Sequence, residues 1–161
     1  MAHFEIQNLK ETQILGKIIA QHLNAPMIIY LNGDLGAGKT TLARAIIQNL
    51  GFLGNIKSPS YSIVEVYPFS RLYLQHFDFY RFTTPEEFEE AGFIEYFNEN
   101  SVSLIEWAEN AAPFVPRADF CVFISANFNN ENARKIEIRV ETKKGEECLK
   151  KIMPQITDAF F

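Results

Sequence analysis

The stretch that decides the fold reads MIIYLNGDLGAGKTT and occupies residues 27–41. Residues 27–32 form a continuous apolar run rich in β-branched side chains between Pro26 and Gly33, which is typical of a strand buried on both faces. Residues 33–40 then match the pattern G-x-x-x-x-G-K-[ST] of a phosphate-binding loop. Because a helical pattern follows at once, the loop stands in the strand–loop–helix context that phosphate binding requires.

The residue types of this loop suit a nucleotide phosphate chain. Glycines let consecutive backbone N–H groups point inward, and the following helix adds its own unpaired N–H groups. Lys39 is expected to reach the β- and γ-phosphates, Thr40 to ligate Mg²⁺, and Thr41 to face the α-phosphate. A dinucleotide fingerprint G-x-G-x-x-G would need glycine where Thr41 stands, so the sequence disfavours a dinucleotide site.

A second buried strand supplies an acidic residue for magnesium. Residues 102–107 read VSLIEW, and we expect Glu106, at the end of the apolar run, to ligate the ion beside a phosphate loop. Trp107 directly follows Glu106, so its fluorescence is expected to report on the site whether or not the ring also packs there. Asp78 shares the predicted face of its strand with His76 and Tyr80, and these side chains could gather near the γ-phosphate. Polar residues also occupy solvated hairpin faces, and spacing alone favours that surface position for Asp78.

A short segment before that strand carries two hydroxyls around a proline. Ser58 and Ser60 flank Pro59, an arrangement that suits a switch contacting the γ-phosphate. Read without its context, the same segment is an ordinary turn.

The remaining periodicity predicts one α/β domain over residues 1–161, P-loop NTPase-like, with a mixed, mostly parallel central sheet, an antiparallel hairpin and flanking helices. Helices are expected over 11–23, 40–50, from 85 toward 92, and around 149–156, where Pro154 should end or kink the last one. Strands are expected over 27–32, 62–67, 72–80, 102–107, 119–125 and 135–141.

Composition excludes several classes of protein. The chain has 161 residues, 47% of them hydrophobic and 22% charged, as in soluble globular domains. Its longest purely apolar stretch is far shorter than the roughly 20 residues of a membrane span, and residues 1–7 lack a signal pattern, so we expect a cytoplasmic protein without a membrane partner. The net charge of −5 argues against direct nucleic-acid binding. Cys121 and Cys148 are expected to be buried thiols.

The motifs together resemble the TsaE family (formerly YjeE), small bacterial P-loop ATPases needed to make threonylcarbamoyladenosine (t6A) in tRNA. The resemblance spans residues 12–134. It rests on GDLGAGKTT at 33–41, SPSY at 58–61, HFDFYR at 76–81 and LIEW at 104–107. Ser60 stands where the family usually has threonine, which keeps the hydroxyl and removes a methyl group.

The resemblance implies roles for particular residues. Nucleotide (ATP/ADP) binding is carried over to Asp34, Leu35, Gly36, Ala37, Gly38, Lys39, Thr40 and Thr41, with Thr12 near the adenine and Arg134 on the nucleotide's other side. The resemblance assigns magnesium binding to Thr40 and Glu106. It also implies a catalytic role for Asp78, whereas spacing alone favours a surface position for that residue. The resemblance also implies that a TsaD–TsaB pair is the partner and that tRNA is involved only indirectly.

Three alternatives remain at this point. A small nucleoside or metabolite kinase would need an acceptor pocket and usually an arginine-rich lid, and nothing after Glu106 resembles one. A GTP-binding switch would carry an N-K-x-D motif, which is absent. A nucleotide-dependent binding module without meaningful hydrolysis has the same sequence signature as a partner-activated ATPase.

Overall fold

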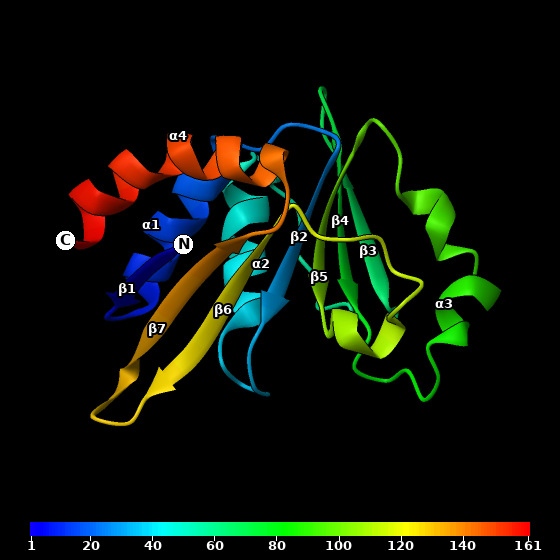
Figure 1. Cartoon of the computed structure of the whole chain (residues 1–161), viewed down its shortest axis with the longest axis horizontal. Coiled ribbons are helices and arrows are strands. Elements are labelled where there is room, and N and C mark those ends of the chain that lie inside the picture. Colours follow the sequence, from blue (N-terminus) through cyan, green and yellow to red (C-terminus); the bar gives the residue numbers. More distant parts are fainter.

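A seven-stranded sheet with the order β1-β7-β6-β2-β5-β4-β3 forms the centre of the computed structural model, which describes all residues from Met1 to Phe161 (Figure 1). The strands are β1 (Ala2–Ile6), β2 (Met27–Asn32), β3 (Val64–Pro68), β4 (Tyr73–Asp78), β5 (Ser101–Glu106), β6 (Phe120–Asn127) and β7 (Asn130–Val140). The helices are α1 (Leu9–Ala20), α2 (Lys39–Asn49), α3 (Glu86–Glu90) and α4 (Lys143–Phe160), with short 3₁₀ helices η1 (Phe93–Tyr96) and η2 (Ala108–Ala111). The predicted α/β class with a mixed sheet, hairpin and flanking helices is confirmed.

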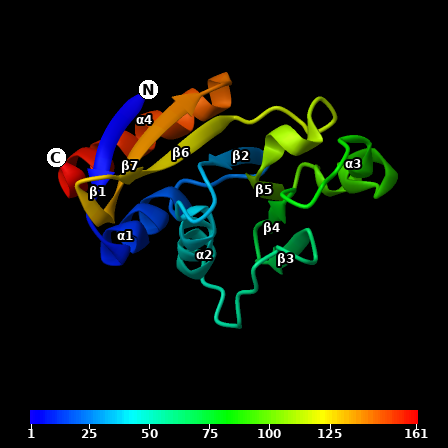
Figure 2. The same cartoon turned by 90° about the horizontal axis from the view of Figure 1, so that it is seen from below.

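The four central strands β6, β2, β5 and β4 run parallel, whereas the pairs β1–β7, β7–β6 and β4–β3 are antiparallel. Three of the six pairings are thus parallel and lie at the centre of the sheet. The three antiparallel pairings extend the sheet at its two edges. The carboxyl ends of the parallel strands meet at the lower edge of the sheet in Figure 1, which is the edge that faces the viewer in Figure 2. Ligands of open α/β sheets bind at this edge.

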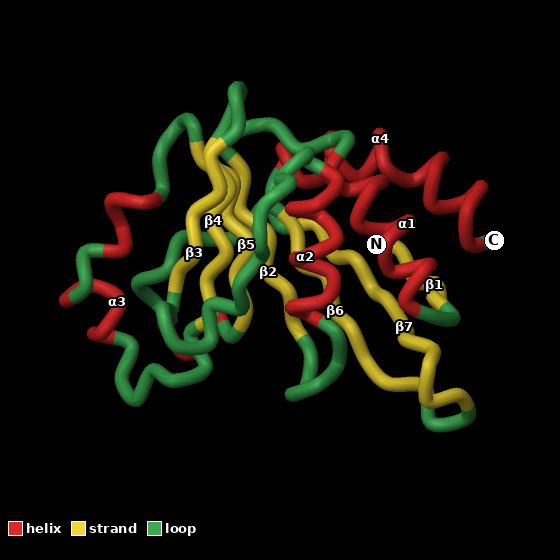
Figure 3. The backbone as a smooth tube through the Cα atoms, turned by 180° about the vertical axis from the view of Figure 1, so that it is seen from behind, coloured by secondary structure: helices red, strands yellow, loops and turns green.

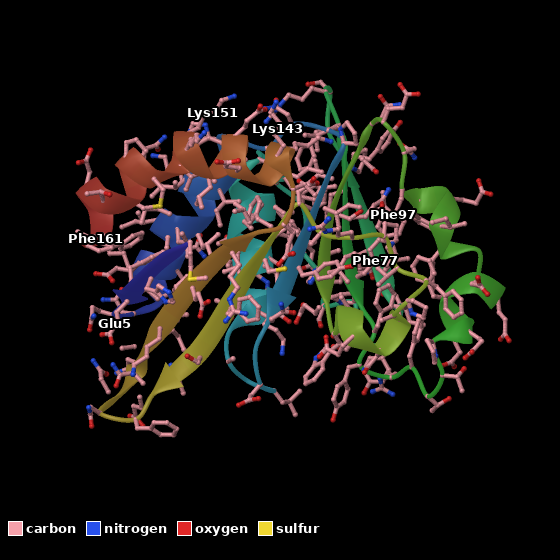
Figure 4. All side chains as sticks on the ribbon, in the orientation of Figure 1. Glu5, Phe77, Phe97, Lys143, Lys151 and Phe161 are labelled. Carbon is pink, nitrogen blue, oxygen red and sulfur yellow. The ribbon has the colours of Figure 1, made fainter.

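Two apolar clusters lie on opposite faces of the sheet. The larger one joins the sheet to α1, α2 and α4. Helices α1 and α2 cover the face of the sheet that is at the rear in Figure 1 and that faces the viewer in Figure 3. The smaller one contains Phe77, Phe88 and Ile105 and lies under α3, η1 and η2, where Phe97 stacks on Phe77 with ring centroids 5.4 Å apart (Figure 4). β2 lies between these clusters, with one face buried and the other half-buried, so burial on both faces is only partly realised.

The first helix begins earlier than periodicity predicts. The side chain of Asn8 accepts a hydrogen bond from the Glu11 backbone N–H, and the Glu11 carboxylate accepts one from the Gln7 N–H at 2.6 Å. This reciprocal cap starts α1 at Leu9 rather than at residue 11. The helix ends at Ala20 rather than at residue 23.

The last helix does not end at its proline. α4 runs from Lys143 to Phe160 with Pro154 inside it, so of the predicted end or kink at Pro154 the end is wrong. Pro154 is exposed, whereas Ile152 and Ile156 are fully buried against the core. Their burial offsets the backbone hydrogen bond that proline cannot donate.

Further differences concern the strands. β1 was not predicted, although Ala2, Phe4 and Ile6 alternate with exposed residues and are buried. Val64 rather than residue 62 begins β3, since Ile63 has a positive φ of 71° that interrupts an extended chain. No helix is both long and apolar enough to span a bilayer.

Candidate functional site: a phosphate loop beside two buried acids

The loop between β2 and α2 has the geometry of a phosphate cradle. Gly38 caps α2 with a left-handed backbone conformation, at φ of 114°. No side chain at the cap accepts a hydrogen bond from the unpaired N–H groups of the first helical turn. Gly33 lies so close to β6 that a Cβ there would be 2.3 Å from the Ile124 carbonyl oxygen. These backbone requirements explain the glycines, and the uncapped helix terminus attracts an anion.

Lys39 carries a buried positive charge at this loop. Its side chain is only 5% exposed, and Nζ donates hydrogen bonds to the carbonyl oxygens of Gly33 and, at 3.2 Å, of Asp34. The ammonium also lies 4.2 Å from the centroid of the Trp107 ring. No carboxylate forms a salt bridge with Lys39, so no acidic side chain neutralises its buried charge.

Two acids meet at the ends of adjacent parallel strands. The register of β4 and β5 places Asp78 opposite Glu106, with exposures of 9% and 2%. The Thr40 hydroxyl lies 3.1 and 3.0 Å from the two oxygens of Glu106, which joins the start of α2 to the end of β5. The surface position that spacing alone favoured for Asp78 is wrong, because β4 is an internal strand flanked by β5 and β3.

The environment of Asp78 raises the pKa of its carboxyl group. Burial is the largest cause, and the nearby Glu106 carboxylate adds to it. A hydrogen bond of 2.9 Å from the Tyr80 backbone N–H to Oδ1, together with the positive charge of Lys39, opposes the rise. Oδ2 makes no hydrogen bond, so one oxygen of a relatively basic carboxylate faces the site.

Two cavities adjoin at the loop and share Gly36, Ala37, Gly38 and Thr41 as lining residues. The larger, of about 730 Å³, lies between the start of α1 and the β6–β7 hairpin and includes Thr12 and Arg134 in its wall. The smaller, of about 470 Å³, is lined by Leu35, Lys39, Thr40, Ser60, Asp78, Glu106 and Trp107, among others. A groove thus passes over the loop from one cavity to the other.

Most of the predicted site residues line this groove, and three do not. Ser58 is exposed and reaches the site only through a 2.7 Å contact with the Ser60 hydroxyl. The Asp34 side chain is exposed and lines neither cavity. His76 is buried behind Glu106, with Nε2 2.6 Å from Oε2 of that carboxylate.

Sequence reasoning missed part of the larger cavity. Its wall includes residues 7–10 at the start of α1 and residues 130–132 of the β6–β7 hairpin, which no motif indicated. In the same wall, Arg134 Nε donates a hydrogen bond of 2.8 Å to the Ala37 carbonyl oxygen. The Asn8-x-x-Glu11 cap was a usable signal for the first segment. The hairpin carries no motif, and only the fold brings it to the loop.

The chain matches, over residues 6–136, the model of the family described as "Threonylcarbamoyl adenosine biosynthesis protein TsaE". It belongs to the TsaE family, which confirms the resemblance drawn from the motifs. TsaE of Haemophilus influenzae is 43% identical over 140 residues, covering 87% of this chain and 85% of that protein. TsaE of Bacillus subtilis is 33% identical over 124 residues, 77% of each chain.

A solved structure agrees with this membership. The crystal structure of Bacillus subtilis YdiB superposes on this TsaE-family chain with a TM-score of 0.77 and 26% identity, over 95% of this chain and 94% of that one. The family belongs to the biosynthesis of tRNA threonylcarbamoyladenosine. The groove over the phosphate loop, which gathers most of the motif residues, is therefore the candidate site for the function of this family member.

Proposed function

We propose that this chain binds ATP with Mg²⁺ and hydrolyses it slowly, as a component of the bacterial t6A machinery that acts in the cytoplasm with a TsaD–TsaB pair. The observation that carries the proposal is the contact of the Thr40 hydroxyl with the Glu106 carboxylate, at 3.0–3.1 Å, beside the uncapped start of α2. It pairs the two oxygen groups that a magnesium–nucleotide site uses with a cradle for phosphate.

The donor set of this site fits magnesium. Mg²⁺ is bound through oxygen ligands, and it typically takes one or two from protein together with phosphates and water. Thr40 and Glu106 supply a hydroxyl and a carboxylate within hydrogen-bond distance of each other, and they would hold the ion. When bound, the ion would neutralise charge on the β- and γ-phosphates.

The chain's own groups would perform the rest of the reaction by positioning and charge. Lys39 and the loop amides stabilise negative charge on the phosphates. Water attacks the γ-phosphorus, and a new oxygen–phosphorus bond forms as the bond to the β–γ bridging oxygen breaks. ADP departs with that electron pair, and the water proton passes to Asp78 Oδ2, which makes no other hydrogen bond.

We expect the isolated chain to turn over slowly. An arginine that stabilises the transferring phosphoryl group contributes about 10³–10⁵ in rate in this class of enzyme. Arg81 is the arginine in the smaller cavity, and its guanidinium stacks at 4.1 Å on the exposed ring of Tyr61. A partner that closes over this rim would complete the site, either with its own cation or by redirecting Arg81.

Three measurements test this proposal. Calorimetry at millimolar magnesium should detect ATP and ADP binding, and phosphate release should be slow alone and faster with TsaD–TsaB. The chain should also restore tRNA threonylcarbamoylation to a reconstituted mixture lacking only its TsaE component. Absence of nucleotide binding by folded protein would refute the proposal, and a phosphorylated small-molecule product would favour the kinase alternative.

A further inference from the structure

His76 is a buried polar residue with no place in the groove itself. It lies on β4, 1% exposed, and lines neither cavity. Its Nε2 is 2.6 Å from Oε2 of Glu106, whose side chain is also buried. The parallel register explains the contact, since His76 pairs with Leu104 and Glu106 is the next residue of β5 on the same face.

The contact fixes the Glu106 carboxylate from a second side. Thr40 approaches both oxygens of this carboxylate, and His76 approaches Oε2 alone. Because a carboxylate only accepts hydrogen bonds, Nε2 carries the proton and donates it. The hydroxyl and the ring together leave the carboxylate little freedom to rotate.

The other nitrogen of the ring shows that this arrangement is not optimal for stability. Nδ1 of His76 is the single buried side-chain nitrogen or oxygen atom in the structure without a hydrogen-bond partner. Its neighbours in the sheet, Leu74 and Leu104, are fully buried apolar residues, and an apolar side chain would suit the position better. Departures of this kind from the stability optimum occur typically at functional sites.

We propose that His76 is a positioning residue, which holds the Glu106 carboxylate beside Thr40 so that the two oxygen groups are ready for the divalent cation accompanying the nucleotide. This inference rests on the proposed function. Groups that orient a metal ligand in this way typically affect metal affinity about 10–100-fold when replaced. His76 should therefore affect cation binding far more than binding of the nucleotide itself.

Three substitutions distinguish positioning from packing. His76→Phe keeps an aromatic ring and removes the donor. His76→Gln places an amide N–H the same number of bonds from Cβ as Nε2, whereas His76→Asn places it where Nδ1 stands. Gln should therefore retain the contact with Glu106, and Asn should lose it.

The experiment measures two affinities on the full chain. Mn²⁺ binding to the ADP complex is followed by electron paramagnetic resonance, and ADP binding without metal by calorimetry. We expect Phe and Asn to weaken Mn²⁺ binding about 10–100-fold with metal-free ADP affinity unchanged, and Gln to restore most of the loss.

Wild-type Mn²⁺ affinity in His76→Phe, or equal behaviour of Asn and Gln, would overturn the role of His76 and leave the proposed function standing. A parallel loss of metal-free ADP affinity and thermal stability would also overturn it in favour of simple packing. Failure of the wild-type chain to bind ADP at all would overturn the proposed function and this inference with it.

Discussion

Replacing Asp78 by asparagine should make the protein more stable and nearly inactive. Asp78 is 9% exposed, and burial raises the pKa of its carboxyl group, with a further contribution from Glu106. Asparagine keeps an oxygen that can accept the 2.9 Å hydrogen bond from the Tyr80 N–H, and it removes the charge. The substitution therefore removes the free-energy cost of burying a charged carboxylate, and it also removes the group proposed to accept the proton during hydrolysis.

The sign and size of the effect follow from proton linkage. Because the pKa of Asp78 is higher in the folded than in the unfolded chain, where it is about 3.9, protonation favours the folded state. That stabilisation is complete below the unfolded pKa and is lost as the pH rises through the folded one. Above it, the charged carboxylate costs stability, and we expect Asp78→Asn to gain about 0.5–2 kcal/mol, or roughly 1–8 °C in Tm.

Urea unfolding over a series of pH values measures this gain, and phosphate release measures the loss of hydrolysis. If Asp78 is the base, activity should fall about 10²–10⁴-fold with nucleotide binding retained. Glu99→Gln, a neutralisation of an exposed acid, is the matched control and should change neither. An Asp78→Asn variant that is less stable, or whose gain does not grow with pH, would refute the reasoning.

Three other outcomes are expected. Lys39→Ala should weaken ATP binding at least about 10-fold in calorimetry, because its buried ammonium, which forms no salt bridge, is the cation proposed to bind the phosphates. Gly145→Ala should lower the free energy of unfolding by about 1–3 kcal/mol in urea titration, since its Cβ would be 1.9 Å from the Asp119 carbonyl oxygen; unchanged stability would contradict that contact. Burial raises the pKa of both Cys121 and Cys148 to about 11, so thiol reagents at neutral pH should react slowly with the native chain and rapidly after unfolding; fast native labelling would count against this assignment.

The local parts of the site could be predicted because neighbouring residues determine them. Glycines at fixed positions, a lysine and a threonine specify a phosphate loop through backbone conformation and the start of one helix, all within residues 33–41. The apolar run before the loop specified β2 in the same way. These features depend on the backbone dihedral preferences of individual residues and on spacing within a few residues, and both can be read from the sequence.

The carboxylate cluster depends on contacts between distant segments. Thr40 and Glu106 are 66 positions apart, His76 and Glu106 are 30 apart, and their meeting requires the parallel register of β4 and β5 and the placement of α2 over it. The same holds for the hairpin that brings Arg134 to the loop, and for Pro154, which packing keeps within α4.

Sequence alone thus determined the class of fold, the family and the phosphate loop. Tertiary structure decided that the Thr40 hydroxyl touches the Glu106 carboxylate directly, that Asp78 is buried, and that His76 lies behind the site rather than in it. The physical reason is that burial and strand register arise from which elements pair across the sheet, and no short stretch of the chain contains that information.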